Sequence, residues 1–170
     1  MNIVYHPNKF LDIKSSAFDL TNDKIDNYND IEQFESDMIK LMVGNRGIGL
    51  AANQIGITKR FFAIGSDTFD KIQKPVIMWN PEIENESEEK TLDIEGCLSF
   101  PNVFLQVLRP KKVDVKWQDK NGITMRSTLD NYESKCFQHE LDHLNGITFN
   151  KRVSKLKWDM ALKRRDKKDA

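Results

Sequence analysis

Apolar side chains recur at helical spacing in one stretch of this chain, and a second stretch is also predicted to be a helix. The first covers residues 31–42, and Gly44 or Gly47 stands where such a helix can end. The second covers residues 131–144 and is followed by Asn145-Gly146, a pair typical of a helix C-terminus. We therefore predict two helices, and we interpret the apolar stripe of the first as core packing.

Runs rich in apolar and β-branched residues predict strands elsewhere in the chain. They lie at residues 60–65, 75–79, 113–117 and 123–129. The last two runs flank Asp119-Lys120-Asn121-Gly122, which is a strong hairpin signal. The acidic run from Glu82 to Asp93 is interpreted instead as a solvated connection.

The two ends of the chain are more polar. Residues 1–27 are weakly periodic, and four apolar residues are expected to anchor them to the body of the protein. These anchors are Phe10, Leu11, Ile13 and Phe18. Residues 154–170 can form a last helix with Leu156, Met160 and Leu162 facing inward. The basic tip of that helix is interpreted as a solvated face.

The composition indicates a single domain over residues 1–170. A chain of 170 residues suits one core, and neither a repeat nor a linker interrupts it. Lys plus Arg (26) equals Asp plus Glu (26), which argues against a dedicated nucleic-acid surface. No stretch is apolar enough to be a signal peptide or a membrane span. With two cysteines and no export signal, we expect free thiols and a reducing, cytoplasmic compartment.

The segment Gln138-His139-Glu140-Leu141-Asp142-His143 carries the clearest chemistry. Two histidines four residues apart share one face of a helix, where both rings can bind one metal ion. Glu140 can then reach a metal-bound water as a general base without being a ligand itself. The alternative is a surface helix that holds two of the chain's three histidines by chance. The helical context favours the metal site.

A catalytic site of this kind usually has three protein ligands and an open position. No Glu, His or Cys follows His143, so the third ligand is expected upstream. Cys136 precedes His143 by seven residues on the same helix, which separates their Cα atoms by about 10.5 Å along the axis. One metal that also binds His139 cannot readily bridge that span, so Cys136 is expected to pack in the core. We predict Cys97, His139 and His143 as the metal ligands.

The segment from Gly47 to Gly56 is dense in residues with small or absent side chains, as expected where another backbone or a ligand comes close. It matches neither a phosphate-binding loop nor a dinucleotide-binding fingerprint. Within it, Gln54 can offer an amide N–H to a developing oxyanion. A tight turn between a helix and a strand explains the segment equally well.

Three blocks of this sequence together resemble the signature motifs of peptide deformylases. In chain order they are Gly47–Gln54 (GIGLAANQ), Glu95–Ser99 (EGCLS) and Gln138–His143 (QHELDH). The resemblance covers most of residues 1–150. It implies an α+β fold, with antiparallel β-sheets packed around a central metal-binding helix that carries HExxH. It also implies a metal-dependent hydrolase that removes the N-formyl group from the initiator methionine of nascent polypeptides.

The mechanism expected of such an enzyme gives roles to three residues. A metal-bound water attacks the formyl carbon, while Glu140 acts first as general base and then as general acid. The Gln54 side-chain amide and the backbone N–H of Leu98 are expected to meet the oxyanion.

Residues that bind or support the substrate are assigned by the same resemblance. The backbone around Ile48 and Gly49 is expected to align the peptide. Glu95 is expected to pair with an arginine, for which Arg109 is the candidate, and to orient the Cys97 loop. A surface ion pair without that role explains Glu95 and Arg109 equally well.

The family also implies a cofactor and partners. One divalent ion is expected per chain, Fe(II) under physiological conditions, with Zn or Ni in purified protein. Thiolate and imidazole ligands do not separate iron from zinc. The expected partners are N-formyl-Met nascent peptides, with transient ribosome association. The protein is expected to be a cytoplasmic monomer that binds neither a membrane nor a specific nucleic acid.

Some positions depart from the family pattern. A substrate-contacting arginine of many relatives aligns with Phe104, and apolar pocket residues align with Asp93, Tyr132 and Lys135. The methionine pocket and the preference for downstream residues are therefore expected to differ from those of bacterial housekeeping enzymes. Two other functions stay open, a peptidase that cuts internal bonds and a non-catalytic, metal-stabilised binding module.

Overall fold

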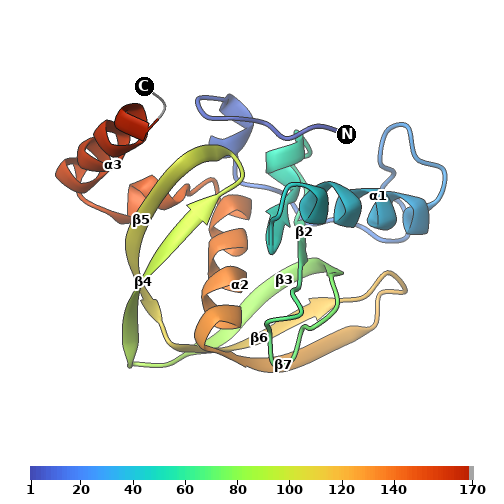
Figure 1. Cartoon of the computed structure of the whole chain (residues 1–170). Coiled ribbons are helices and arrows are strands. Elements are labelled where there is room, and N and C mark those ends of the chain that lie inside the picture. The colour runs from blue at the N-terminus through green and yellow to red at the C-terminus, as the bar shows by residue number, and fades with distance from the viewer. Residues whose placement is uncertain (169–170) are drawn as a thin grey trace.

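Two antiparallel β-sheets and three α-helices make up the computed structural model over residues 1–168, which are the residues that it describes (Figure 1). The helices are α1 (Ile31–Gly44), α2 (Asn131–Leu144) and α3 (Lys155–Lys168). The strands are β1 (Gly49–Ala51), β2 (Phe61–Ile64), β3 (Val76–Glu86), β4 (Lys90–Cys97), β5 (Phe100–Pro110), β6 (Lys112–Gln118) and β7 (Thr124–Asp130). Short 3-10 helices cover Lys9–Asp12, Ala52–Ile55 and Phe149–Arg152.

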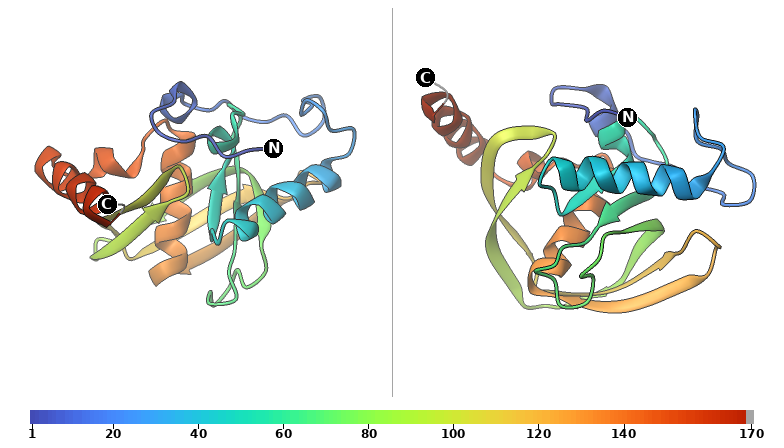
Figure 2. Two further views of the ribbon diagram at one scale, coloured as in Figure 1. Left: turned by 45° about the horizontal axis from the view of Figure 1, so that its top comes forward. Right: turned by 45° about the vertical axis from the view of Figure 1, so that its right-hand side comes forward.

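The helix α2 lies between the two sheets. The larger sheet has the strand order β1-β2-β3-β6-β7, and the smaller sheet pairs β4 with β5. Each of these strand pairs is antiparallel. The β4–β5 hairpin curves along one side of α2, and strands of the larger sheet cover the other side (Figure 1 and Figure 2). The predicted α+β fold, with antiparallel sheets packed around the HExxH helix, is confirmed.

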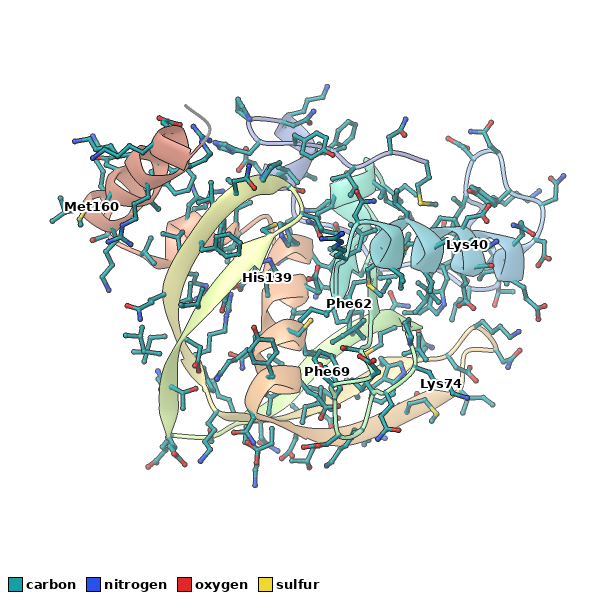
Figure 3. The ribbon with its side chains drawn as sticks, viewed as in Figure 1. Lys40, Phe62, Phe69, Lys74, His139 and Met160 are labelled. Carbon is teal, nitrogen blue, oxygen red and sulfur yellow. The ribbon has the colours of Figure 1, made fainter. Side chains whose placement is uncertain are left out.

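The main core fills the space between α1, α2 and the larger sheet. Phe34, Phe61 and Trp79 are fully buried there, with ring centroids 4.6, 5.4 and 6.2 Å apart. Phe62 on β2 packs edge-to-face against Phe137 on α2 at 5.1 Å (Figure 3). Aromatic pairs of this kind contribute about 0.5–1.5 kcal/mol beyond the area that they bury. This packing fixes the helix with the histidines against the sheet.

Ten of the fourteen residues of α2 are buried, although its sequence is polar. The Asp130 side chain caps its N-terminus, and Gly146 follows its C-terminus with a φ of 71°, a left-handed conformation that suits glycine. Within the helix, the Glu133 carboxylate accepts from the N–H groups of Lys71 and Ile72, both at 2.7 Å. A buried polar group left unpaired costs about 1–3 kcal/mol, so such contacts allow a polar helix to occupy the core.

The strands β3, β4 and β5 differ from the sequence prediction. The interpretation of the run from Glu82 to Asp93 as a solvated connection is wrong, because β3 extends to Glu86 and β4 begins at Lys90. Two of its acidic side chains are paired across the larger sheet, where Lys116 on β6 lies 3.0 Å from Glu82 and Arg126 on β7 lies 3.2 Å from Glu84. The prediction of strands from apolar runs also misses β5, because the residues of this strand alternate between buried and exposed positions.

The helix α3 presents a different face from the one predicted. Leu156 and Met160 are 70% and 45% exposed, and Figure 3 shows Met160 on the outer side of the helix. Trp158 and Ala161 pack inward together with Leu162, because the large indole ring of Trp158 lies against Phe100 of β5. The inward prediction is therefore confirmed for Leu162 alone. No helix within residues 1–168 is long and apolar enough to cross a membrane.

The N-terminal segment ties two parts of the molecule together. Of its predicted anchors, Leu11 and Phe18 are buried, whereas Ile13 is exposed. The backbone N–H of Val4 donates to a carbonyl of the glycine-rich segment at 2.7 Å, and that of His6 donates to the β4–β5 turn at 2.9 Å. The segment therefore holds the glycine-rich block next to the EGCLS block.

Candidate metal centre

Three pairs of side chains connect β4 to α2. The pairs are Asp93 with Lys135, Glu95 with His139, and Cys97 with His143. Two residues advance about 6.6 Å along a strand, and four residues advance about 6.0 Å along a helix. Because these steps nearly match, every second residue of β4 meets every fourth residue of α2. We call these three pairs the ladder.

The ladder brings together the three predicted metal ligands. Cys97 Sγ lies 3.2 Å from His143 Nε2, and one ligand atom from each of Cys97, His139 and His143 lies within 4.8 Å of the others. Both histidines are buried, and Cys97 is partly exposed (Figure 3 labels His139). Cys136 is not part of this group, and its buried thiol donates to the Ile48 carbonyl at 3.5 Å. The expectation that Cys136 packs away from the histidines is confirmed.

The two imidazoles have contrasting electrostatic surroundings. His139 Nδ1 lies 2.9 Å from the Glu95 carboxylate, which leaves Nε2 to face the ligand group. Burial by itself lowers the pKa of His139, but hydrogen bonds to Cys97 and Glu95 outweigh it and raise the pKa well above its usual value. Burial and the charge on His139 lower the pKa of His143 well below its usual value. His143 is therefore neutral, which is the form of imidazole that binds metals.

Glu95 belongs to a buried charge network behind His139. Arg109 is 3% exposed, pairs with both Glu95 oxygens, and donates to Asp142 at 2.8 Å. Asp142 also accepts from the Arg152 Nε at 2.9 Å. Burial by itself raises the pKa of Glu95, but His139 and Arg109 lower it to about 2. The pair of Glu95 and Arg109 is thus not a surface ion pair, and the ionised Glu95 orients the His139 ring.

Glu140 lines the same cleft as Cys97 and His139 and is itself buried. Burial raises its pKa to about 7, and the charge on His139 counteracts part of this shift. A Cβ at Gly49 would lie 2.7 Å from the Glu140 Cδ, so the glycine makes room for this carboxyl group.

The donor set and one unpaired oxygen decide whether a metal ion fits. Glu140 Oε2 is buried and meets no hydrogen-bonding group among the residues that the structure describes. Such an oxygen suits a water molecule brought by a bound ion. One sulfur and two imidazole nitrogens are donors that Zn and Fe(II) accept and that Mg and Ca do not favour. The residues present therefore fit one divalent transition-metal ion.

Gln54 and Leu98 lie next to Cys97. The Gln54 amide nitrogen donates to Cys97 Sγ at 3.4 Å and to Ser99 Oγ at 3.0 Å, and its oxygen accepts from the Ala51 N–H at 2.8 Å. Leu98 directly follows Cys97 in the two-residue turn between β4 and β5, and it lines the cleft. The glycine-rich block therefore both forms a turn and places a polar side chain at the site.

A cleft of about 600 Å³ leads to these groups. Ile48 and Gly49 line it, and β1, which begins at Gly49, is the edge strand of the larger sheet. An edge strand offers unpaired backbone groups to an extended peptide. Tyr132 and Lys135 line the cleft as well, whereas Arg109 is buried behind Glu95 and is not among the lining residues.

Sequence reasoning missed Arg152 as part of this region, and it placed Lys135 in the pocket only through the alignment with relatives. No motif contains Arg152, and its contact with Asp142 depends on the turn after α2. For Lys135 a signal existed, because it precedes His139 by four residues and therefore shares its helix face. Asp142 stands inside the third motif, but spacing alone does not reveal its two arginine partners.

Comparisons with known proteins bear directly on this geometry. Residues 1–159 match the family model described as polypeptide deformylase. The peptide deformylase of Wolbachia sp. subsp. Brugia malayi (strain TRS) is 38% identical over 175 residues, which cover 98% of this chain and 94% of that protein. The chain belongs to the peptide deformylase family. It is a metal-dependent hydrolase that removes the formyl group from nascent polypeptides, as the resemblance implied.

Other relatives agree in sequence and in structure. The peptide deformylase of Rhizobium meliloti (strain 1021) is 38% identical over 135 residues, which cover 79% of this chain and 78% of that protein. The crystal structure of the Thermotoga maritima peptide deformylase superposes with a TM-score of 0.79 at 33% identity and covers 90% of this chain and 97% of its own. The crystal structure of the Synechococcus elongatus peptide deformylase in complex with actinonin superposes with a TM-score of 0.81 at 33% identity. The match covers 97% of this chain and 85% of that chain.

Proposed function

We propose that the cleft hydrolyses the formyl amide of N-formyl-Met peptides, with Cys97, His139 and His143 holding one divalent metal ion. The observation that carries this proposal is the convergence of these three side chains within 4.8 Å in a cleft that Glu140 also lines. Three protein ligands with a free position are typical of catalytic sites, whereas structural sites are closed by four.

Glu140 is the proton carrier in this proposal. When bound, the ion lowers the pKa of water toward neutrality and polarises the formyl oxygen. Glu140 takes a proton from the attacking water as the new C–O bond forms. It then gives that proton to the amide nitrogen as the C–N bond breaks, which releases formate and the free amine. The unpaired Oε2 of Glu140 supports this role.

Two donors next to Cys97 stabilise the oxyanion of the tetrahedral intermediate. The Gln54 amide is held in place because its oxygen accepts from the Ala51 N–H at 2.8 Å. The backbone N–H of Leu98 is the second donor, fixed by the tight turn that follows Cys97. Losing one donor of this kind typically costs about 10²–10³ in turnover.

The remaining predicted residues position the peptide and the His139 ring. The edge strand at Ile48 and Gly49 aligns the backbone of the peptide next to Glu140. Glu95 and Arg109 support the site from behind, since Glu95 fixes the His139 ring and Arg109 holds Glu95.

The finer properties of the enzyme are also proposals. Fe(II) is the physiological ion, and Zn or Ni replaces it in purified protein, because the sulfur and nitrogen donors accept all three. The enzyme works as a cytoplasmic monomer with one catalytic domain over residues 1–170. It meets its substrates during transient contact with the ribosome.

The test is a formate assay under anaerobic conditions with the iron-loaded protein. Formyl-Met-Ala-Ser is expected to yield formate and free amine in equal amounts, while acetyl-Met-Ala-Ser is expected to remain intact. Cleavage of an internal peptide bond would support a peptidase instead. Intact metal without any turnover of formyl peptide would support a non-catalytic binding module.

A further inference from the structure

Four exposed apolar side chains form a strip on the outer face of the β4–β5 hairpin. The strip consists of Leu92, Ile94, Phe104 and Leu108, which are 49–60% exposed. In the strand register, Leu92 lies opposite Leu108, Ile94 opposite Gln106, and Gly96 opposite Phe104. None of these six outward positions is charged, so a continuous uncharged surface faces away from α2.

The apolar strip is continuous with the catalytic cleft. Ile94 and Phe104 line the cleft together with Cys97. The Phe104 ring covers Gly96, where a Cβ would lie 2.9 Å from a ring carbon. Gly96 is the direct neighbour of the proposed metal ligand Cys97. The strip therefore begins at the mouth of the cleft and follows the hairpin away from it.

We propose that this apolar strip binds the nascent chain downstream of its formyl-methionine and selects apolar side chains there. The inference rests on the proposed function, because a formyl group placed at Cys97, His139 and His143 determines where the rest of the peptide leaves the cleft. The five residue steps from Cys97 back to Leu92 span about 17 Å, the length of a five-residue extended peptide. Alternate side chains of such a peptide face one surface, so two or three of them meet the strip.

The position of the strip favours the substrate over other occupants. A second copy of the chain seated on Ile94 and Phe104 would cover the mouth of the cleft and exclude the peptide. The nascent chain gains apolar burial on the same surface while its formyl group occupies the site. Exposed apolar patches rimmed by polar residues commonly mark binding surfaces of this kind.

The test compares two formyl peptides of five residues that differ only at their third and fourth positions, which are both leucine or both serine. The full metal-loaded protein is used, and the ratio of the two kcat/KM values is taken within each variant, so that a general loss of activity cancels. We expect the wild-type protein to prefer the leucine peptide by about tenfold, because one of the two adjacent leucine side chains faces the strip and its burial contributes about that much. Phe104→Ser and Ile94→Ser are each expected to lower the ratio to about two.

Ile123→Ser is the matched control. Ile123 is 58% exposed, close to the 59% of Ile94, but it lies in the β6–β7 turn outside the strip. The ratio is expected to stay at the wild-type value in this variant. A fall of the ratio in Ile123→Ser as large as that in Ile94→Ser would overturn the inference.

Four other results would also overturn it. Equal kcat/KM values for both peptides in the wild-type protein would remove the strip as a selective surface, while the release of formate would leave the proposed function intact. A leucine preference that persists in both strip variants would place the selection elsewhere. A dimer that Phe104→Ser converts into a monomer in sedimentation would assign the strip to a second copy. No formate from either peptide would remove the proposed function, and this inference with it.

Discussion

Asp93 on β4 forms an ion pair with Lys135 on α2, one step along the ladder from the contact between Glu95 and His139. The Lys135 side chain is 12% exposed and lines the cleft, whereas the Asp93 side chain is 41% exposed. A lysine whose ammonium group is held in this way presents its methylene groups and a fixed charge to the cleft. This pair therefore puts a polar element into the wall next to the proposed metal site.

Replacement of Lys135 by methionine tests this wall. Lys135→Met removes the charge and keeps an unbranched chain, so KM for formyl-Met peptides is expected to fall severalfold. Asp93→Ala leaves the ammonium group without its carboxylate partner, so KM is expected to rise. Steady-state kinetics with formyl-Met-Ala-Ser measure both effects. Shifts of KM in the same direction in the two variants would show that the charge does not act on the substrate.

Glu140→Gln tests the proton carrier. Glutamine keeps the shape of the side chain beside Gly49 but cannot carry the proton, so kcat is expected to fall by about 10²–10⁴. The metal content, measured by elemental analysis, is expected to equal that of the wild-type protein. Near-normal kcat in this variant would remove Glu140 from the chemistry.

The two cysteines provide a matched pair. Cys97→Ser is expected to lose the metal ion and activity, because an alcohol replaces the thiolate among the ligands. Cys136→Ser is expected to retain the ion and to lose about 1 kcal/mol of unfolding free energy, since its buried side chain keeps the Ile48 carbonyl as a partner. Elemental analysis and denaturant titration distinguish these outcomes. Equal loss of metal in both variants would contradict the ligand assignment.

Asp142→Asn tests the network behind the histidines. Asp142 is buried between Arg109 and Arg152, so the loss of its charge is expected to lower the unfolding free energy by about 3–5 kcal/mol. Metal affinity is expected to fall about tenfold or more, because Arg109 also holds Glu95.

The control for that variant is Asp166→Asn on α3. Within the part of the chain that the structure describes, Asp166 pairs with its neighbour Arg165 at an exposed position, so the change in unfolding free energy is expected to stay within about 1 kcal/mol. Comparable destabilisation by the two asparagine variants would show that the buried network carries no special weight.

The carboxyl group of Glu35 makes the stability of the folded protein depend on pH. Glu35 accepts from the Trp79 Nε1–H at 2.8 Å, and burial raises the pKa of Glu35 above its usual value. The folded state therefore binds the proton more tightly than the unfolded state, and stability falls as pH rises through the folded-state pKa. Glu35→Gln keeps the acceptor and removes this loss.

We thus expect Glu35→Gln to be more stable relative to the wild-type protein at pH 7 than at pH 4. Urea titrations of both proteins at the two pH values measure this difference. Glu88→Gln, at an exposed position in the β3–β4 turn, serves as the control and is expected to show a much smaller one. If Glu35→Gln were instead more stable relative to the wild-type protein at pH 4 than at pH 7, the folded state would stabilise the Glu35 carboxylate. That result would contradict the prediction.

The sequence predicts those features of this molecule that depend on local spacing. The bounds of α2 follow from its capping residues, and helix geometry alone separates Cys97 from Cys136 as a partner of the histidines. Contacts between distant polar residues leave no such pattern. The pairing of Lys135 with Asp93, and of Arg152 with Asp142, depends on how the turns place β4 and the segment after α2.

Local spacing also fails to predict some strands and the inward face of one helix. The acidic residues at the end of β3 look like a loop until basic residues of β6 and β7, such as Lys116 and Arg126, are seen to pair with them across the sheet. The inward face of α3 depends on where Trp158 finds a pocket against β5, which no periodicity within the helix decides.

A single strand supplies both the chemistry and the surface proposed for the rest of the substrate. Alternation along β4 sends residues 93, 95 and 97 toward α2, and residues 92, 94 and 96 toward solvent. Deleting one residue within this strand would exchange the faces of the residues on one side of the deletion. Apolar side chains would then face the histidines of α2, and the carboxyl or thiol side chains would point into water. The number of residues in β4 is therefore constrained by the side-chain alternation. We expect the composition of the strand to change far more readily than its length.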